Sequence, residues 1–306
     1  MQNKNPLVTV ILPVYNGEKT IEATLKSLLA QTFTNFELLI GIDGTKDGSK
    51  QIVKSFNDER IQIVENPVNL GLGPNVNKLI SLANTSSKYI AMAEQDDVYV
   101  SNRLKWQVEV MEKNAAIGLV SGIAEFVTDT KKTQFPGLLI RGEQFPQGAE
   151  LFKFLYINQL KVVNTCMLIR KSVHQQNKLK FTNKYPNMNV DWDYVLRFSL
   201  ISKVYGIPKV LVAMSRRSKN QSVTTNKWKQ FETSRRLILD FKKEFPKLID
   251  NGTYNKALKM CRKVELGHHS KFGILFYSIV YFLRYFDSGF LKYLNNKIRL
   301  YKKNNF

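Results

Sequence analysis

Short apolar segments rich in β-branched residues alternate with helix-like segments over residues 8–93. Strands are expected at residues 8–14, 36–42, 61–65 and 89–93. Between them, apolar residues recur every three or four positions, as on one face of a helix. This alternation predicts an α/β fold in which a mostly parallel, Rossmann-like sheet carries helices on both faces. Further along the chain, strands are expected at residues 162–169 and 204–214, and loops at 135–137 and 145–148.

Acidic turns directly follow two of the expected strands. Asp43 ends the second strand, and Asp96 and Asp97 follow the fourth. Right-handed crossovers bring the carboxyl ends of parallel strands to one edge, where open α/β sheets bind their ligands. Adjacent carboxylates are hard oxygen ligands that suit Mg²⁺ or Mn²⁺, which often bind substrate phosphates as well. Two neighbouring acids are also common in a solvated turn, so this pair alone leaves both interpretations open.

Positive charge is concentrated in the second half of the chain. The net charge of the 306 residues is +21; residues 1–150 hold 15 Lys and Arg against 17 Asp and Glu, and residues 151–306 hold 31 against 8. Such a field attracts phosphates, in nucleic acid or on an anionic membrane, unless it is only a solvated basic face. The two cysteines, Cys166 and Cys261, are far apart, so neither a disulfide framework nor a zinc site is expected, and a reducing compartment fits best.

Several segments, in order along residues 7–110, resemble the motifs of the family 2 glycosyltransferases. The first strand and its turn read Val-Thr-Val-Ile-Leu-Pro-Val-Tyr-Asn-Gly at 8–17, and Ile-Asp-Gly-Thr-Lys-Asp-Gly-Ser follows at 42–49. Glu-Gln-Asp-Asp at 94–97, with the helix after it, is similar to the family's metal-binding segment. The ordered set implies the GT-A fold, sugar transfer with inversion from a nucleotide diphosphate donor, and a divalent metal, Mn²⁺ or Mg²⁺.

The resemblance also implies roles for individual residues. Asp191, within Val-Asp-Trp-Asp at 190–193, falls on the catalytic base, although a carboxylate that caps a helix would look the same. Asp96 and Asp97 fall on the metal site. The implied donor contacts are Pro13, Tyr15, Asn16, Asp43, Asn77, Asp96 and Arg216.

Some positions depart from the family's pattern, mostly in the second half. Glu94 replaces a frequent Asp, which favours Asp96 and Asp97 as the metal ligands. Ser215 and Ser218 stand around Arg216 where Tyr and His are usual, which weakens the case for phosphate coordination there. The other departures are Ile42, Val76 and Val190, which replace an acid, an Arg and an acid.

The composition of the chain changes near residue 224. Residues 1–224 are expected to form the GT-A catalytic domain, with a nucleotide-sugar half at about 1–115 and an acceptor half at about 116–224. Residues 225–306 are expected to form a basic, aromatic, helical region, with 18 Lys and Arg against 6 Asp and Glu from Lys227 onward. Its apolar run at 272–283 is shorter than the roughly 20 residues that span a bilayer. A core helix and a helix on an anionic membrane surface both fit.

The expected activity is transfer of a hexose or N-acetylhexosamine, from UDP by family habit, to a glycan in capsule, O-antigen or lipooligosaccharide synthesis. The acceptor would be lipid-linked if the C-terminal region binds membrane, and the chain is expected in the cytoplasm, also peripherally on the inner face of the membrane. A catalytically silent GT-A scaffold or glycan-binding protein is one alternative. A nucleotidyltransferase would normally show a Gly-rich loop where residues 8–20 contain only Gly17. Nucleic acid is not expected as a partner, because no recognised binding motif is present.

Overall fold

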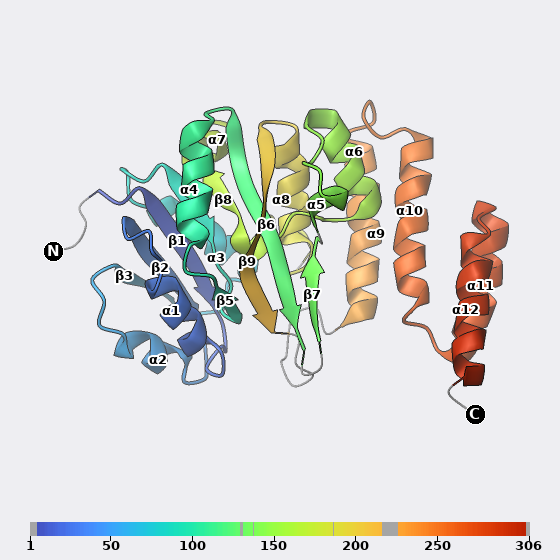
Figure 1. Cartoon of the computed structure of the whole chain (residues 1–306), viewed down its shortest axis with the longest axis horizontal. Helices are drawn as coiled ribbons and strands as arrows, with labels where there is room; N and C mark the ends of the chain where they lie inside the picture. The colour runs from blue at the N-terminus through green and yellow to red at the C-terminus, as the bar shows by residue number, and fades with distance from the viewer. Residues whose placement is uncertain (1–4, 129–130, 137, 186, 216–225, 304–306) are drawn as a thin grey trace. The chain divides into compact units, whose positions relative to one another are not determined.

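The computed structural model describes residues 5–128, 131–136, 138–185, 187–215 and 226–303 (Figure 1). The chain divides into two compact units, one from residues 1–155 with 160–223 and one from residues 156–159 with 224–306. Arg216, an expected donor contact, lies outside the described residues.

The first unit is built on a β-sheet. Its strands are β1 (Val8–Val14), β2 (Phe36–Asp43), β3 (Ile61–Asn66), β4 (Tyr89–Met92), β5 (Asp97–Tyr99), β6 (Ile117–Val127), β7 (Lys132–Phe135), β8 (Leu168–Arg170) and β9 (Lys203–Ser215). Across the described residues these nine strands follow the order β3–β2–β1–β4–β8–β6–β9–β5, with β7 paired to β6.

Four neighbouring strands form the parallel part of this sheet. β1 pairs in parallel with β2 and β4, and β2 pairs in parallel with β3. The expected parallel character is therefore found in the first half, whereas the second half is mixed: β8 is antiparallel to β4 and β6, and β5 is antiparallel to β9. The carboxyl ends of β1, β2 and β4 meet at one edge, as predicted, so Asp43 and the Glu94–Asp97 turn share it.

Helices cover both faces of the sheet, which confirms the α/β class. In the view of Figure 1, α1 and α4 lie in front of the sheet and α3 and α8 behind it. The helices before residue 200 are α1 (Ile21–Leu29), α2 (Ser49–Ser55), α3 (Leu72–Leu82), α4 (Arg103–Lys113), α5 (Leu138–Arg141), α6 (Gly148–Asn158), α7 (Lys171–Gln176), α8 (Val190–Ser199) and the 3-10 helix η1 (Asn164–Cys166).

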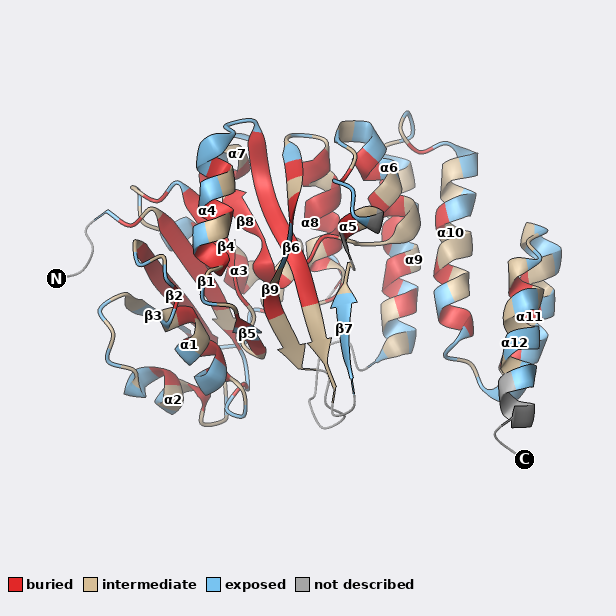
Figure 2. Cartoon of the chain, viewed as in Figure 1, coloured by how far each residue is buried: buried red, intermediate tan, exposed pale blue. Residues whose placement is uncertain are grey.

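The main hydrophobic core lies on the side of the sheet covered by α1 and α4. Alternate residues of β1 point into it, and the buried face of α1 is made by Ile21, Leu25 and Leu28 at helical spacing. Every residue of β2 is buried, as is usual for a strand in a sheet covered on both faces. Figure 2 shows the same burial along β1 and β2.

One expectation about the second half was wrong. The expected strand at residues 162–169 divides into η1 and the short β8. One reason is that a side chain competes for a backbone hydrogen bond there. Gln107 Nε2 donates to the Cys166 carbonyl at 2.6 Å, so this carbonyl is not available to pair with a neighbouring strand. The expected loop is found at residues 145–147, and α6 begins directly after it, at Gly148. β9 was predicted, and its register with β6 shifts after Ile207, where Pro208 has no N–H to donate.

The second unit contains four helices among the described residues. They are α9 (Lys227–Glu244), α10 (Asn251–Leu266), α11 (Lys271–Tyr285) and α12 (Gly289–Lys303). Asn226, Asp250 and Ser270 precede the first three and each accepts a hydrogen bond from a backbone N–H of the first turn, which explains where these helices begin. Within the described residues, no helix is both long and apolar enough to cross a membrane.

We predict that His174 makes the stability of the chain dependent on pH. Burial lowers the pKa of His174 to about 4, and its Nδ1 lies 2.9 Å from the Tyr194 hydroxyl. The unfolded chain, with a His pKa of about 6.5, binds a proton more readily, so stability is full above that pH and falls as the pH drops toward 4. The loss should approach about 3 kcal/mol.

Urea unfolding of the wild type and of His174→Asn at pH 7 and at pH 4.5 checks this. The Asn amide can replace Nδ1 toward Tyr194 but does not titrate, so the variant should lose less stability on acidification. Tyr194→Phe is the control that removes the hydrogen bond and keeps the titrating ring. Equal losses in the wild type and His174→Asn would contradict the assignment.

Candidate functional site

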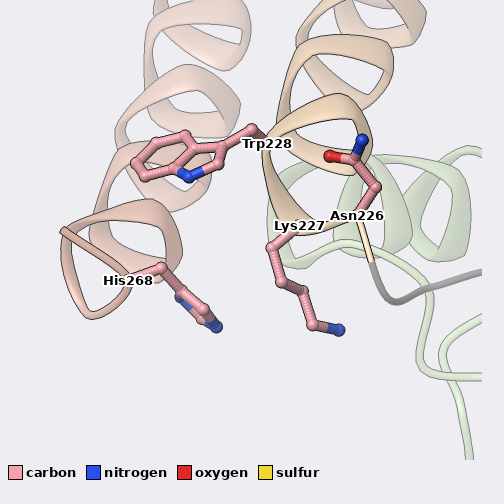
Figure 3. Close-up of a pocket in the computed structure, with 4 residues that line it drawn as sticks. All are labelled: Asn226, Lys227, Trp228 and His268. Carbon is pink, nitrogen blue, oxygen red and sulfur yellow. The ribbon is translucent and has the colours of Figure 1, made fainter.

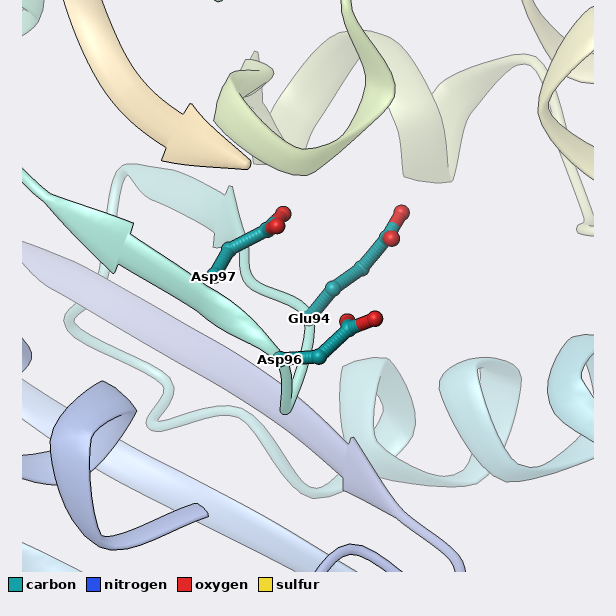
Figure 4. Close-up of side chains that lie close together, drawn as sticks. All are labelled: Glu94, Asp96 and Asp97. Atoms are coloured by element: carbon teal, nitrogen blue, oxygen red, sulfur yellow. The ribbon is translucent and has the colours of Figure 1, made fainter. Parts of the chain in front are cut away.

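Three carboxylates meet in the turn between β4 and β5. Glu94, Asp96 and Asp97 each place one carboxylate oxygen within 4.8 Å of the others. Figure 4 shows the three side chains extending from this turn to the same side. Asp97 is buried, and Glu94 and Asp96 are partly exposed. The cluster thus lies at the carboxyl edge of the parallel strands and is accessible from solvent.

Hydrogen bonds from other elements hold the acidic turn in place. The buried hydroxyl of Thr24, on α1, donates to the carbonyls of Gln95 at 2.9 Å and Asp97 at 2.8 Å. The Glu94 N–H donates to the Tyr99 hydroxyl at 2.8 Å. Asn164 Nδ2 donates to Glu94 Oε1 at 2.8 Å. The backbone and one carboxylate are therefore fixed before any ligand arrives.

Burial and crowded negative charge both shape the electrostatics of the site. Burial, together with the charges of Asp97, Asp96 and Asp191, raises the pKa of Glu94 well above its usual range, and the hydrogen bond from Asn164 only partly offsets this. The contribution of Asp191 to this shift means that it lies close to the cluster. The fold thus brings together acids that are almost a hundred residues apart in the sequence.

Asp191 lies in the first turn of α8. The N-cap of this helix is Asn189, which adopts a left-handed conformation with φ 54°, so Asp191 is not the capping residue. Its Oδ1 accepts the Trp192 N–H at 2.9 Å, while burial raises the pKa of its carboxyl. Trp192 is itself anchored by its indole N–H, which donates to the Leu155 carbonyl at 3.2 Å. A carboxylate with a raised pKa is a better proton acceptor near neutral pH.

The turn after β1 is fastened to the neighbouring turns. The Gln95 side chain accepts from the Tyr15 N–H at 2.9 Å and donates to the Tyr15 carbonyl at 3.0 Å. Asn16, with φ 50°, accepts the Lys46 N–H at 3.0 Å and donates its own N–H to Thr45 Oγ1 at 2.9 Å. The Tyr15 residue stays 43% exposed, so its ring is available to a ligand. Pro13 precedes this turn in β1.

Asp43 is buried and already bonded within the protein. Its Oδ1 accepts from Asn66 Nδ2 and the Leu70 N–H, both at 2.9 Å, and its Oδ2 accepts from the Gly71 N–H at 3.0 Å. Its carboxylate thus positions the loop that leads into α3. Gly44, with φ 63°, permits the close approach of this loop, because a Cβ would lie 2.5 Å from the Asn69 nitrogen. Contact between Asp43 and a nucleobase stays a prediction.

Asn77 is also engaged in an internal contact. Its amide donates to the Phe181 carbonyl at 2.8 Å and accepts the Phe181 N–H at 2.9 Å. Both ends of the side chain are therefore used to hold the 181 region against α3. The geometry gives Asn77 a positioning role, and its direct contact with the donor stays a prediction.

Four residues of the site were not assigned to it from the sequence. Glu94 was set aside because it replaced a more usual Asp, yet it belongs to the cluster. Thr24 gave a signal that could have been recognised, since it is a hydroxyl on the otherwise apolar inner face of α1. Gln95 and Asn164 act through contacts that only the folded chain creates.

A separate hollow of about 550 Å³ belongs to the second unit. It is lined by Asn226, Lys227, Trp228 and His268, shown in Figure 3. The lining carries no carboxylate, so it offers neither hard ligands for Mg²⁺ or Mn²⁺ nor a carboxylate base. Among the described residues, the acidic cluster is therefore the better candidate for a site that binds a metal.

The donor set of the acidic cluster fits a divalent cation. Three carboxylates whose oxygens converge within 4.8 Å offer the hard ligands that Mg²⁺ and Mn²⁺ prefer. A cation at this point would also relieve the mutual repulsion that raises the pKa of Glu94. Asp96 and Asp97, the ligands expected from the sequence, are both in the set.

Comparison with known proteins gives the class of the chain. The profile of glycosyl transferase family 2 matches residues 9–177, which is more than half of the chain. The chain therefore belongs to this family and is a glycosyltransferase.

Two curated bacterial relatives are similar over most of their length. The UDP-Glc:alpha-D-GlcNAc-diphosphoundecaprenol beta-1,3-glucosyltransferase WfgD of Escherichia coli is 27% identical over 237 residues, which cover 77% of this chain and 86% of that protein. The putative teichuronic acid biosynthesis glycosyltransferase TuaG of Bacillus subtilis is 28% identical over 242 residues, which cover 75% of this chain and 86% of that protein.

Solved structures confirm the GT-A fold. TarS of S. aureus in complex with UDP matches with a TM-score of 0.58 and 17% identity, over 76% of this chain and 65% of that chain. The mannosyltransferase PcManGT of Pyrobaculum calidifontis, in complex with GDP-Man and Mn²⁺, matches with a TM-score of 0.56 and 12% identity, over 95% of this chain and 84% of that chain. At these identities the likeness concerns the fold alone.

Replacing Thr24 by Val should weaken the acidic turn. The substitution keeps the shape but leaves the carbonyls of Gln95 and Asp97 without this donor. The expected loss of unfolding free energy is about 1–3 kcal/mol, together with a lower affinity for Mn²⁺. Chemical unfolding and Mn²⁺ titration measure the two effects. Thr24→Ser, which keeps the hydroxyl, should recover most of both, and a Val variant that equals the wild type in both would rule out this role.

Proposed function

We propose that this chain moves a sugar from a nucleotide diphosphate donor to a glycan acceptor in the synthesis of a bacterial surface polysaccharide. The observation that carries the proposal is the cluster of Glu94, Asp96 and Asp97, with Asp191 close enough to raise the pKa of Glu94. The names of the relatives support the pathway, since one acts on a diphosphoundecaprenol-linked sugar and the other is assigned to teichuronic acid.

The donor is proposed to be a UDP-hexose or a UDP-N-acetylhexosamine. The exposed ring of Tyr15 would stack on the base, and the turn of Pro13 and Asn16 would form the adjoining wall. UDP is supported by the donor in the name of the Escherichia coli relative, and by the complexes of TarS with UDP and with UDP-GlcNAc. Arg216 is proposed to add positive charge near the phosphates.

The chemistry proposed is a single displacement at the anomeric carbon. Asp191 accepts the proton of an acceptor hydroxyl, and that oxygen bonds to the anomeric carbon as the bond to the diphosphate oxygen breaks. The raised pKa of Asp191 suits this task, and Trp192 orients the carboxylate through its N–H. Attack from the face opposite the leaving group inverts the configuration.

Asp96 and Asp97, with Glu94, are proposed to hold a divalent cation. Bound there, Mn²⁺ or Mg²⁺ would supply positive charge against the diphosphate oxygens. Asn164 keeps Glu94 directed at the cluster, and Thr24 keeps the turn from moving.

The acceptor is proposed to be lipid-linked, with the chain working at the inner face of an anionic membrane. In this proposal residues 1–224 catalyse the transfer and residues 225–306 contribute the membrane contact. The 18 Lys and Arg against 6 Asp and Glu after residue 226 support it.

Asp191→Asn should bind the donor as the wild type does and lose turnover by about 10²–10⁴-fold, because the proton acceptor is removed. Release of UDP from a UDP-sugar in the presence of an undecaprenyl-diphosphate-linked acceptor measures turnover, and calorimetry measures donor affinity. Asp193→Asn is the matched control, since Asp193 is buried in an ion pair with Arg197 at 2.9 Å. Near-normal kcat in Asp191→Asn would exclude it as the base.

Asp97→Asn should remove the effect of Mn²⁺ on donor binding. In the wild type, Mn²⁺ is expected to tighten binding of the UDP-sugar by at least about tenfold, because the diphosphate is otherwise brought against like charge. Glu22→Gln, which alters an exposed acid paired with Lys26 on α1, is the control. The metal assignment fails if Asp97→Asn still shows the full Mn²⁺ effect.

A further inference from the structure

Helix α11 carries apolar side chains on two opposite faces. Its inner face is buried through Ile274, Ser278 and Tyr281. Tyr281 packs with Leu266 and Phe290 in the small core of the second unit. The contacts of this inner face are sufficient to pack α11 against its neighbouring helices.

The opposite face of α11 is apolar and open to solvent. Its residues follow one another at intervals of three or four, so they form one stripe along the helix and its C-cap. We name this set the outer stripe: Phe272 (86% exposed), Leu275 (46%), Phe276 (61%), Ile279 (45%), Leu283 (60%) and Phe286 (88%). Single exposed apolar residues are ordinary, whereas a contiguous stripe of this size marks an interaction surface.

The unit that carries the outer stripe is rich in positive charge. The neighbouring helix α12 carries five Lys and Arg and no acid. Two of the acids in this unit are already paired twice: Glu265 with Arg235 and Arg262, and Asp287 with Lys259 and Lys263. The excess of cations in the second unit therefore stays available to a negatively charged partner.

We propose that the outer stripe of α11 inserts into the interface of an anionic lipid bilayer, with the cations of α12 drawn to its headgroups. The inference rests on the proposed function in that a lipid-linked acceptor lies in such a membrane. An amphipathic helix with aromatic residues on one side and cations nearby binds membranes in this way. A second copy of the chain is a poorer occupant, because it would bring an equally basic surface into contact.

Co-sedimentation of the full chain with vesicles tests the inference. Vesicles of phosphatidylglycerol and phosphatidylcholine should bind the wild type at least about tenfold more tightly than phosphatidylcholine alone, and less so at high salt. Phe272→Ser combined with Phe276→Ser should lower binding at least about tenfold. Val68→Ser combined with Leu82→Ser is the matched control, since these residues are 61% and 50% exposed in the first unit, and it should bind as the wild type does.

Three outcomes would overturn the inference. They are equal binding to both vesicle types, a Phe272/Phe276 variant that binds like the wild type, and a wild-type dimer in sedimentation velocity that this variant abolishes without any binding to vesicles. UDP release from a UDP-sugar with a water-soluble, short-chain diphosphate-linked sugar as acceptor, measured without vesicles, separates this inference from the proposed function. If the wild type releases UDP normally but does not bind anionic vesicles, only the membrane surface is rejected. If it binds the vesicles but releases no UDP, only the activity is rejected.

Discussion

Negative charge crowded into one turn is the constraint on which the rest of the structure depends. Glu94, Asp96 and Asp97 repel one another, so the turn needs an external framework to hold its shape. The framework is supplied by Thr24 on α1 and by Asn164 in η1. Both partners are brought there by the packing of the sheet and its helices, which ties the acid cluster to the whole first unit.

The same arrangement links the two halves of the first unit. The parallel strands carry the acidic turn and the turns of Tyr15 and Asp43, which are the proposed donor side. Helix α8, from the second half, brings Asp191 within electrostatic range of Glu94. The proposed proton acceptor and the proposed metal site thus come near one another although they belong to separate regions of the sequence, as a displacement at one carbon would require.

The sequence predicted the parallel strands and the edge where their acids meet, because strand–helix alternation and turn residues are local signals. It predicted the family from ordered motifs, and the family match confirms that prediction. It missed the division of residues 162–169, because Gln107 bonds a backbone carbonyl there from a distant helix. It could not foresee that Asn77 bonds Phe181, because that contact exists only between elements far apart in the chain. Glu94 was set aside for a different reason: it stands where the family often has Asp, although it lies in the same turn as Asp96 and Asp97.

The most direct test of the central claim is a thermal-shift panel with UDP-, GDP- and dTDP-sugars, each with and without Mn²⁺. The account predicts that one nucleotide class, with UDP expected, raises the melting temperature, and only when the metal is present. Such a result would tie the acidic cluster to the diphosphate of the donor. A flat response to all three classes with Mn²⁺ present would contradict the account.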